Sequence, residues 1–97
     1  MRVVAKKILR EFWEQHPDVE EPLLSWYREV EHEDWDTPAK VKQRYPNASI
    51  VGDNRVVFNI KGHAYRLIVK INYPYRVVYI RFVGTHADYD RINVEEV

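Results

Sequence analysis

The chain has 97 residues, which corresponds to a single domain spanning residues 1–97 with one hydrophobic core. Hydrophobic residues make up 45% of it and charged residues 31%, so we do not expect intrinsic disorder, and the absence of cysteine excludes disulfides, thiolate zinc sites and a cysteine nucleophile. No apolar run approaches ~18 residues and the first residues lack the apolar stretch of a signal peptide, which predicts a soluble, cytoplasmic protein with no membrane partner.

The first half of the chain predicts helices. Residues 3–15 repeat apolar side chains at helical spacing with charged residues between them, which is typical of an amphipathic helix. Asp18 is a candidate N-cap for a second helix that ends near His32. Thr37 and Pro38 form a start signal for a short third helix, which ends at Arg44 because a proline follows two residues later.

The second half predicts strands, because the apolar period changes from 3.6 to 2 after Asn47. We expect strands at Arg55–Ile60, Tyr65–Ile71 and Arg76–Val83, all rich in β-branched and aromatic residues. Their short connections favour an antiparallel meander. Helices followed by consecutive strands indicate an α+β fold in which N-terminal helices pack on one face of a small antiparallel sheet.

The net charge is zero, with 15 basic and 15 acidic residues, but the charges are segregated. Residues 54–87 contain six Lys or Arg and no Asp or Glu. Such a segment suggests an anionic partner for this part of the chain. A sheet whose solvent edge is basic as a guard against aggregation remains the alternative at this point.

Strand alternation sorts these cations by face. Leu67, Val69, Val78, Ile80 and Phe82 are expected to face the helices. The polar and cationic residues of the opposite face are Asn59, Lys61, Arg66, Lys70, Tyr79 and Arg81. Cations around an aromatic ring are typical of surfaces that bind single-stranded nucleic acid, so we predict RNA binding by Asn59, Lys61, Tyr79, Arg81 and Arg55.

The end of the third strand carries the residues best suited to chemistry. Metal-free RNA cleavage needs a group that takes the ribose 2′-hydroxyl proton, fixed cations at the phosphate, and a donor for the departing 5′-oxygen. His86 suits either proton role, and Tyr89 can position the 2′-hydroxyl or exchange a proton. Arg66, Lys70 and Arg81 can clamp the phosphate, and Lys70 among these cations is also a candidate base. Gly84 is expected to allow a sharp turn that aims His86. The four histidines lack metal-ligand spacing, so neither a metal nor another cofactor is predicted.

At these residues the sequence resembles the HigB toxins of bacterial type II toxin–antitoxin systems, within the RelE-like superfamily. The resemblance covers nearly the whole chain. The segments that carry it are Leu9–Pro17, Trp35–Ala39, Tyr45–Ser49, Arg55–Gly62, Tyr65–Leu67 and Tyr79–Asp90.

The resemblance implies a RelE-like fold and a metal-independent endoribonuclease, an mRNA interferase that cleaves mRNA in the ribosomal A site and is neutralised by a HigA-type helix-turn-helix antitoxin. The family's Thr-His-x-x-Tyr-Asp stretch lies at Thr85, His86, Tyr89 and Asp90, and Arg66 matches on the second strand. Asp90 either orients His86 or caps a final helix. Two other interpretations stay open: a non-catalytic RNA- or ribosome-binding module, and a protein-interaction domain with a basic face.

Overall fold

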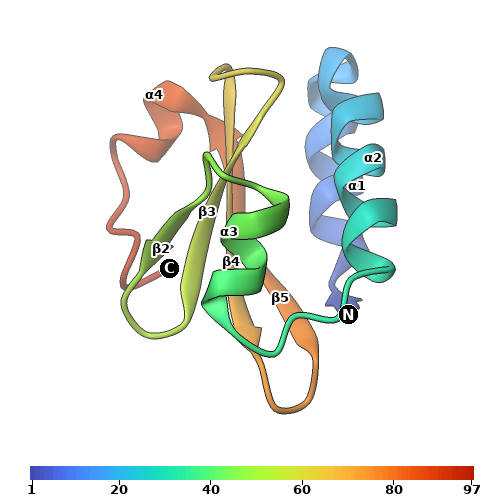
Figure 1. The fold of residues 1–97 in the computed structure, drawn as a ribbon. Helices are drawn as coiled ribbons and strands as arrows, with labels where there is room; N and C mark the ends of the chain where they lie inside the picture. Colours follow the sequence, from blue (N-terminus) through green and yellow to red (C-terminus); the bar gives the residue numbers. More distant parts are fainter.

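The computed structural model describes all residues, 1–97. Three N-terminal helices and a five-stranded sheet make up most of the chain (Figure 1). The helices are α1 (Lys6–Gln15), the short 3-10 helix η1 (Pro17–Val19), α2 (Glu20–Glu31), α3 (Pro38–Arg44) and α4 (His86–Tyr89). The strands are β1 (Arg2–Val4), β2 (Ser49–Val51), β3 (Arg55–Ile60), β4 (Tyr65–Asn72) and β5 (Val77–Thr85). No helix combines the length and the apolar character needed to cross a bilayer.

The sheet has the strand order β1-β5-β4-β3-β2. The meander β3–β4–β5 is antiparallel, as the sequence predicts, and β2 extends it as an antiparallel edge strand. The prediction of a helix from residue 3 is wrong at its start, because Arg2–Val4 pairs in parallel with β5. The α+β class is confirmed, with a mixed sheet in place of a purely antiparallel one.

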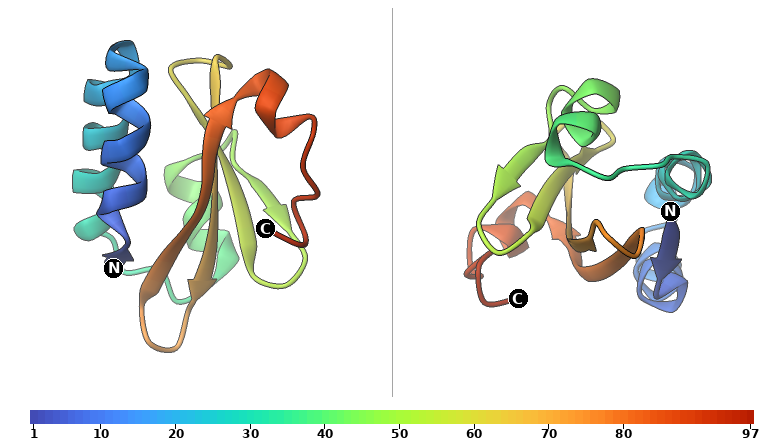
Figure 2. Two further views of the ribbon diagram at one scale, coloured as in Figure 1. Left: turned by 180° about the vertical axis from the view of Figure 1, so that it is seen from behind. Right: turned by 60° about the horizontal axis from the view of Figure 1, so that its bottom comes forward.

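The helices cover one face of the sheet, where α1 and α2 stand side by side in both views of Figure 2. A core of 19 buried residues joins them to the strands. Trp26 and Trp35 pack on Phe58 from this side, with ring centroids 5.4 and 6.2 Å away. Leu67 and Val69 of β4 are fully buried in the same core, which confirms that these alternate residues face the helices.

The opposite face of the sheet is partly covered as well. Residues 90–97 leave α4 and run back beside β2 and β3 (Figures 1 and 2). At the far end of this tail the main-chain oxygen of Val97 accepts hydrogen bonds from Arg55 Nε at 3.1 Å and Arg55 Nη2 at 2.7 Å. Val57 and Ile68 point to this face and are nevertheless buried, at 2% and 0% exposed. The tail and Phe82 therefore cover part of this face, whereas Tyr79 and Arg81 of β5 remain exposed on it.

A β-bulge corrects the predicted facing of β5. Val69 pairs with Ile80 and Ile68 pairs with Phe82, so Arg81 is an extra residue with no partner in β4. The extra residue reverses the alternation beyond it. Val83 therefore packs against the core, and the prediction that Phe82 faces the helices is wrong.

Candidate functional site

The end of β5 brings a histidine, an arginine and an aspartate together. His86 is the first residue of α4, and its Nε2 atom lies 3.3 Å from Nη2 of Arg66 on β4. Its Nδ1 atom lies 3.2 Å from Oδ2 of Asp90, one helical turn further on. The histidine side chain is 49% exposed, so this cluster is open to a ligand.

These two contacts together define one tautomer of His86. A guanidinium can only donate hydrogen bonds, so Nε2 must offer its lone pair to Arg66. The ring proton then lies on Nδ1 and is donated to Asp90, which fixes the orientation of the ring. We assign the neutral Nδ1–H form on this hydrogen-bond geometry. In this form Nε2 is an acceptor that faces the cation at which an anion would bind.

Arg66 also contacts Tyr89. The Arg66 guanidinium carbon lies 5.0 Å from the centroid of the Tyr89 ring, a cation–π distance, and the Tyr89 and His86 ring centroids are 6.4 Å apart. The Nε atom of Arg66 is buried and has no hydrogen-bond partner in the chain. The contact of Nη2 with His86 is the only hydrogen-bond contact that the Arg66 side chain makes within the chain, so the outer guanidinium nitrogens remain able to bind an anion placed between His86 and Tyr89.

The short helix α4 is held by its own first turn. Thr85 Oγ1 accepts a hydrogen bond from the Asp88 amide, and Asp88 Oδ2 accepts one from the Thr85 amide, both at 3.1 Å. This is a capping box. The hydrogen bonds from the Thr85 backbone and side chain keep the pKa of the Asp88 carboxyl below its ordinary value. Since Thr85 caps the helix, Asp90 is free to orient His86.

Gly84 positions α4 by close packing. A Cβ atom on Gly84 would lie 2.6 Å from Cζ of Phe82 and 3.0 Å from Cβ of Asp88. The φ angle of Gly84 is not positive, so the expected sharp turn is absent. Phe82 and α4 instead lie directly against the bare Cα of this residue.

Lys70 and Tyr79 lie toward the opposite end of the same strands, and Arg81 lies between that end and the cluster, at the bulge in the middle of β5. Lys70 pairs in register with Tyr79, whereas Arg66 pairs with Gly84. Four residues of strand separate Lys70 from Arg66, about 13 Å at ~3.3 Å per residue, so Lys70 does not reach the phosphate position beside His86. Its Nζ atom lies 3.2 Å from Asp53 Oδ2. Lys70, Tyr79 and Arg81 instead line a cavity of about 590 Å³.

Arg55 and Lys61 are not free cations on the open surface. Arg55 is only 6% exposed, because it binds the Val97 oxygen and forms an ion pair of 2.6 Å with Asp53. Lys61 forms an ion pair of 2.8 Å with Asp18, the same carboxylate that accepts from the Tyr65 hydroxyl. Tyr65 belongs to the helix-facing core, so the prediction that Lys61 lies on the opposite face is wrong.

Comparison with known proteins places the chain in a family. The family model described as HigB_toxin, RelE-like toxic component of a toxin-antitoxin system, matches residues 19–92. The chain belongs to the HigB toxin family. It is similar to a protein named mRNA interferase HigB from Escherichia coli O6:H1 (strain CFT073), with 24% identity over 94 residues, 95% of this chain and 91% of the relative.

A second relative, named mRNA interferase toxin HigB, comes from Escherichia coli K12. It is 25% identical over 92 residues, which cover 93% of this chain and 88% of the relative. The relative from Escherichia coli O157:H7 named mRNA interferase HigB matches to the same extent. As the toxic component of such a system, this HigB-family chain is paired with an antitoxin.

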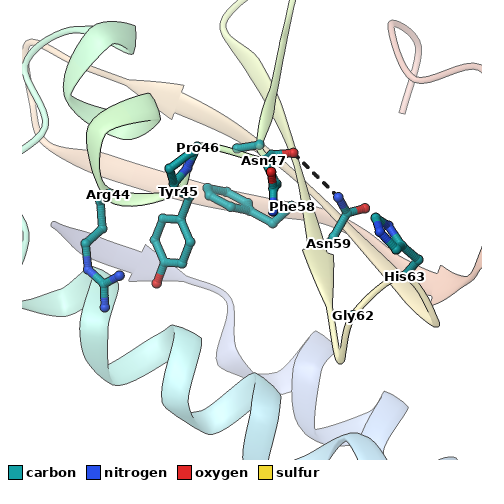
Figure 3. Close-up of a pocket in the computed structure, with 9 residues that line it drawn as sticks. Arg44, Tyr45, Pro46, Asn47, Phe58, Asn59, Gly62 and His63 are labelled. Carbon is teal, nitrogen blue, oxygen red and sulfur yellow. Dashed lines mark hydrogen bonds between the residues drawn. The ribbon is translucent and has the colours of Figure 1, made fainter.

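Asn59 lies in a different hollow of this HigB-family toxin. Figure 3 shows it beside Asn47, Phe58 and His63, in a cavity of about 290 Å³ at the end of β3 that β2 does not cover. Its amide nitrogen donates to the Asn47 oxygen at 3.5 Å (Figure 3), and its side-chain oxygen is buried without a partner. Asn59 is also the in-register partner of Arg66 across β3 and β4, so the structure places it on the same face of the sheet as Arg66, next to the cluster at His86.

Sequence reasoning missed the residues that restrain the predicted ones. Asp53 lies in the turn before β3 and binds both Arg55 and Lys70. Asn54 and Asn72 line the cavity beside Tyr79. Nothing in their local sequence distinguishes them from ordinary turn residues, since Asn and Asp are common in turns for conformational reasons. No three His, Cys, Asp or Glu side chains lie close enough together to hold a metal ion.

Proposed function

We propose that this HigB-family toxin is an endoribonuclease that cleaves mRNA at the cluster formed by His86, Arg66 and Tyr89. The observation that carries the proposal is the contact of 3.3 Å between His86 Nε2 and Arg66 Nη2, with His86 Nδ1 directed at Asp90. A proton acceptor oriented by a carboxylate, in contact with a fixed cation, supplies two of the three requirements of ribose-assisted RNA cleavage. The relatives' printed name, mRNA interferase, supports the same activity.

The proposed reaction needs only the chain's own side chains and the RNA. The scissile phosphate takes the Arg66 guanidinium as its partner, which releases the lone pair of His86 Nε2. Nε2 removes the 2′-hydroxyl proton, and the 2′-oxygen attacks phosphorus while the bond from phosphorus to the 5′-oxygen breaks. Tyr89 donates its hydroxyl proton to that oxygen. The products are a 2′,3′-cyclic phosphate and a 5′-hydroxyl, and water returns the proton from His86 to Tyr89.

The partners of this reaction are part of the proposal. We expect the toxin to cleave mRNA in the ribosomal A site and a HigA-type helix-turn-helix antitoxin to neutralise it. Arg66 and Arg81, the two cations of residues 54–87 that form no ion pair within the chain, support an anionic substrate. Co-expression with the antitoxin should restore growth, and the purified complex should leave mRNA intact on programmed ribosomes.

The decisive experiment compares purified variants on programmed ribosomes and on free RNA, with EDTA present. His86→Ala removes the proton acceptor and should slow cleavage about 10²–10⁴-fold. Arg66→Gln removes the charge at the phosphate and should cost about 10²–10³-fold. His32→Ala and Arg28→Gln, which change exposed residues at the end of α2, are the matched controls and should cleave as the wild type does.

The chemistry of the ends separates the proposal from its alternatives. A cyclic phosphate at the 3′ end agrees with attack by the 2′-oxygen, whereas a 5′-phosphate contradicts it. If folded His86→Ala and Arg66→Gln cleave at the wild-type rate, the cluster is not the active site. If the wild type binds RNA or ribosomes but leaves the RNA uncut, the chain is a binding module. Circular dichroism of each variant establishes that it is folded.

A further inference from the structure

We propose that the cavity at the start of β5 is a nucleobase-binding subsite in which an unpaired base of the RNA stacks on Tyr79 beside Arg81. This inference rests on the proposed function, because it extends the path of the same RNA strand away from His86. The cavity has a volume of about 590 Å³, twice that of the hollow at Asn59. Its lining includes Tyr79 and Arg81, which are exposed on the face of the sheet opposite the helices.

The first support is that Arg81, a charged residue of this cavity, has no ion-pair partner within the chain. Arg81 takes part in none of the eight ion pairs of the protein. Arg55, Lys61 and Arg76, by contrast, are all held by carboxylates. No acidic residue lines the cavity. Lys70 is paired with Asp53, but Arg81 has no carboxylate partner, so the cavity keeps one unpaired cation that favours an anionic ligand such as a nucleotide.

The second support is the exposed aromatic ring. Tyr79 is 39% exposed although it lies within a strand. A base stacked on an aromatic side chain with a cation nearby is the usual arrangement in proteins that bind single-stranded nucleic acid. Asn54 and Asn72 line the same cavity. The Asn72 side-chain oxygen accepts from the Tyr75 amide at 3.2 Å, which leaves its amide group to donate to the edge of a base.

The third support is the β-bulge. Because Arg81 is the extra residue, β5 presents Tyr79, Arg81 and Phe82 to the open face within four residues. Bulges are frequent next to active sites, where they redirect a side chain. Here the bulge lets Phe82 pack on Gly84 beneath α4 while Arg81 stays unpaired. The same irregularity therefore serves both ends of the proposed RNA path.

The subsite is separate from the cleavage cluster. Lys70 beside Tyr79 is about 13 Å along β4 from Arg66, whereas stacked nucleotides rise about 3.4 Å each, so the bound base lies more than one nucleotide from the cleaved bond. Ile68 and Phe82 lie between the two positions on the same face. A strand of RNA that crosses them is held at two points, and its register on the enzyme determines which bond reaches His86.

The test measures binding of a fluorescent 2′-O-methyl RNA pentamer, which cannot be cleaved by 2′-oxygen attack, over a range of salt concentrations. Tyr79→Ala should weaken binding about 5- to 150-fold, the fold-change that corresponds to a stacking contribution of about 1–3 kcal/mol. Tyr79→Phe keeps the ring and should stay within about twofold of the wild type. Tyr75→Ala is the matched control, since Tyr75 is 79% exposed and does not line the cavity.

The salt dependence separates a base contact from a phosphate contact. Arg81→Gln should reduce the slope of log affinity against log salt by about 0.7, the value for one phosphate of a single strand. Tyr79→Ala should lower affinity without changing this slope. Arg10→Gln, on the exposed side of α1, should change neither quantity.

The outcomes distinguish this inference from the proposed function. If Tyr79→Ala binds as tightly as Tyr75→Ala, or if the wild type fails to bind the pentamer at millimolar concentration, the subsite is wrong, whether or not the toxin cleaves mRNA. If the pentamer binds in a Tyr79-dependent way but the wild type never cuts RNA, the subsite stands and the catalytic proposal fails.

Discussion

Replacing Gly84 with alanine tests whether close packing at the end of β5 holds the site together. The added methyl group would lie 2.6 Å from Phe82 Cζ and 3.0 Å from Asp88 Cβ. Carbon atoms in contact are ordinarily about 3.5–4.0 Å apart, so the Phe82 ring must retreat by about 1 Å or α4 must move outward. Movement of the Phe82 ring disturbs its packing next to Ile68, and movement of α4 displaces His86.

The cost follows from these distances. Overpacking of this kind lowers the free energy of unfolding by about 1–3 kcal/mol. Alanine also reduces the conformational entropy of the unfolded chain relative to glycine, which raises the free energy of unfolding by about 0.4–1 kcal/mol. The midpoints of these ranges leave a net loss of about 1.3 kcal/mol, so for a domain of this size we expect Tm to fall by about 5–10 °C. Thermal unfolding followed by circular dichroism measures this shift. Cleavage by the folded variant should fall about 10²-fold, because misplacing a catalytic group by about 1 Å has effects of that size.

Two further variants make this prediction refutable. A Cβ atom on Gly52 would meet no other atom within 4 Å, and the φ angle of this residue is not positive, so Gly52→Ala should be neutral or stabilising by about 0.4–1 kcal/mol. Phe82→Leu shortens the side chain that the methyl group strikes, so the double variant should be more stable than the sum of the two single changes allows. If Gly84→Ala melts like Gly52→Ala, or if Phe82→Leu gives no such coupling, the packing argument is wrong.

Two other predictions concern the tail and the final helix. Arg55→Gln removes charged hydrogen bonds to Val97 and Asp53, so denaturant unfolding should show a loss of about 1.5–3 kcal/mol and amides of residues 90–97 should exchange faster; unchanged exchange would contradict the role of Arg55 as an anchor. The folded-state pKa of Asp88 is depressed, so its contribution to α4 is present above the unfolded value of about 3.9 and is lost as pH falls through the lower folded value. NMR of the Thr85 amide between pH 5 and 2 should follow this loss, and Asp88→Asn should abolish the transition.

Much of the fold could be predicted because local signals agree with the tertiary structure. The helix Pro38–Arg44 and the strand Arg55–Ile60 have the predicted bounds. In the first case Thr37 and two prolines mark the ends, and in the second the period-2 pattern is unbroken. The contact between Arg66 and His86 could also be predicted from the sequence, because antiparallel pairing brings the start of β4 next to the end of β5.

The facing of individual side chains could not be predicted where it depends on one extra residue or on distant partners. The bulge at Arg81 turns Phe82 to the open face, and the sequence around it has the same β-branched and aromatic character as a regular strand. Lys61 lies on the helical side of the sheet because its ammonium group binds Asp18, which is 43 residues away in the sequence. Arg55 is buried by Val97, which is 42 residues away. No local pattern reports contacts of that separation.

The covering of the open face explains why a segment with six cations and no acid need not be a uniformly basic surface. Arg55, Lys61 and Arg76 are bound to carboxylates from elsewhere in the chain, and Lys70 shares Asp53 with Arg55. Arg66 and Arg81 are left without a carboxylate. Arg66 lies near the start of β4 beside an oriented imidazole, and Arg81 lies at the bulge in the middle of β5 and lines the same cavity as an exposed tyrosine ring. Ion pairs within the chain therefore leave two of the six cations, Arg66 and Arg81, available to bind an anion. The distance between these two cations can determine the register of a bound RNA strand, which net charge alone cannot do.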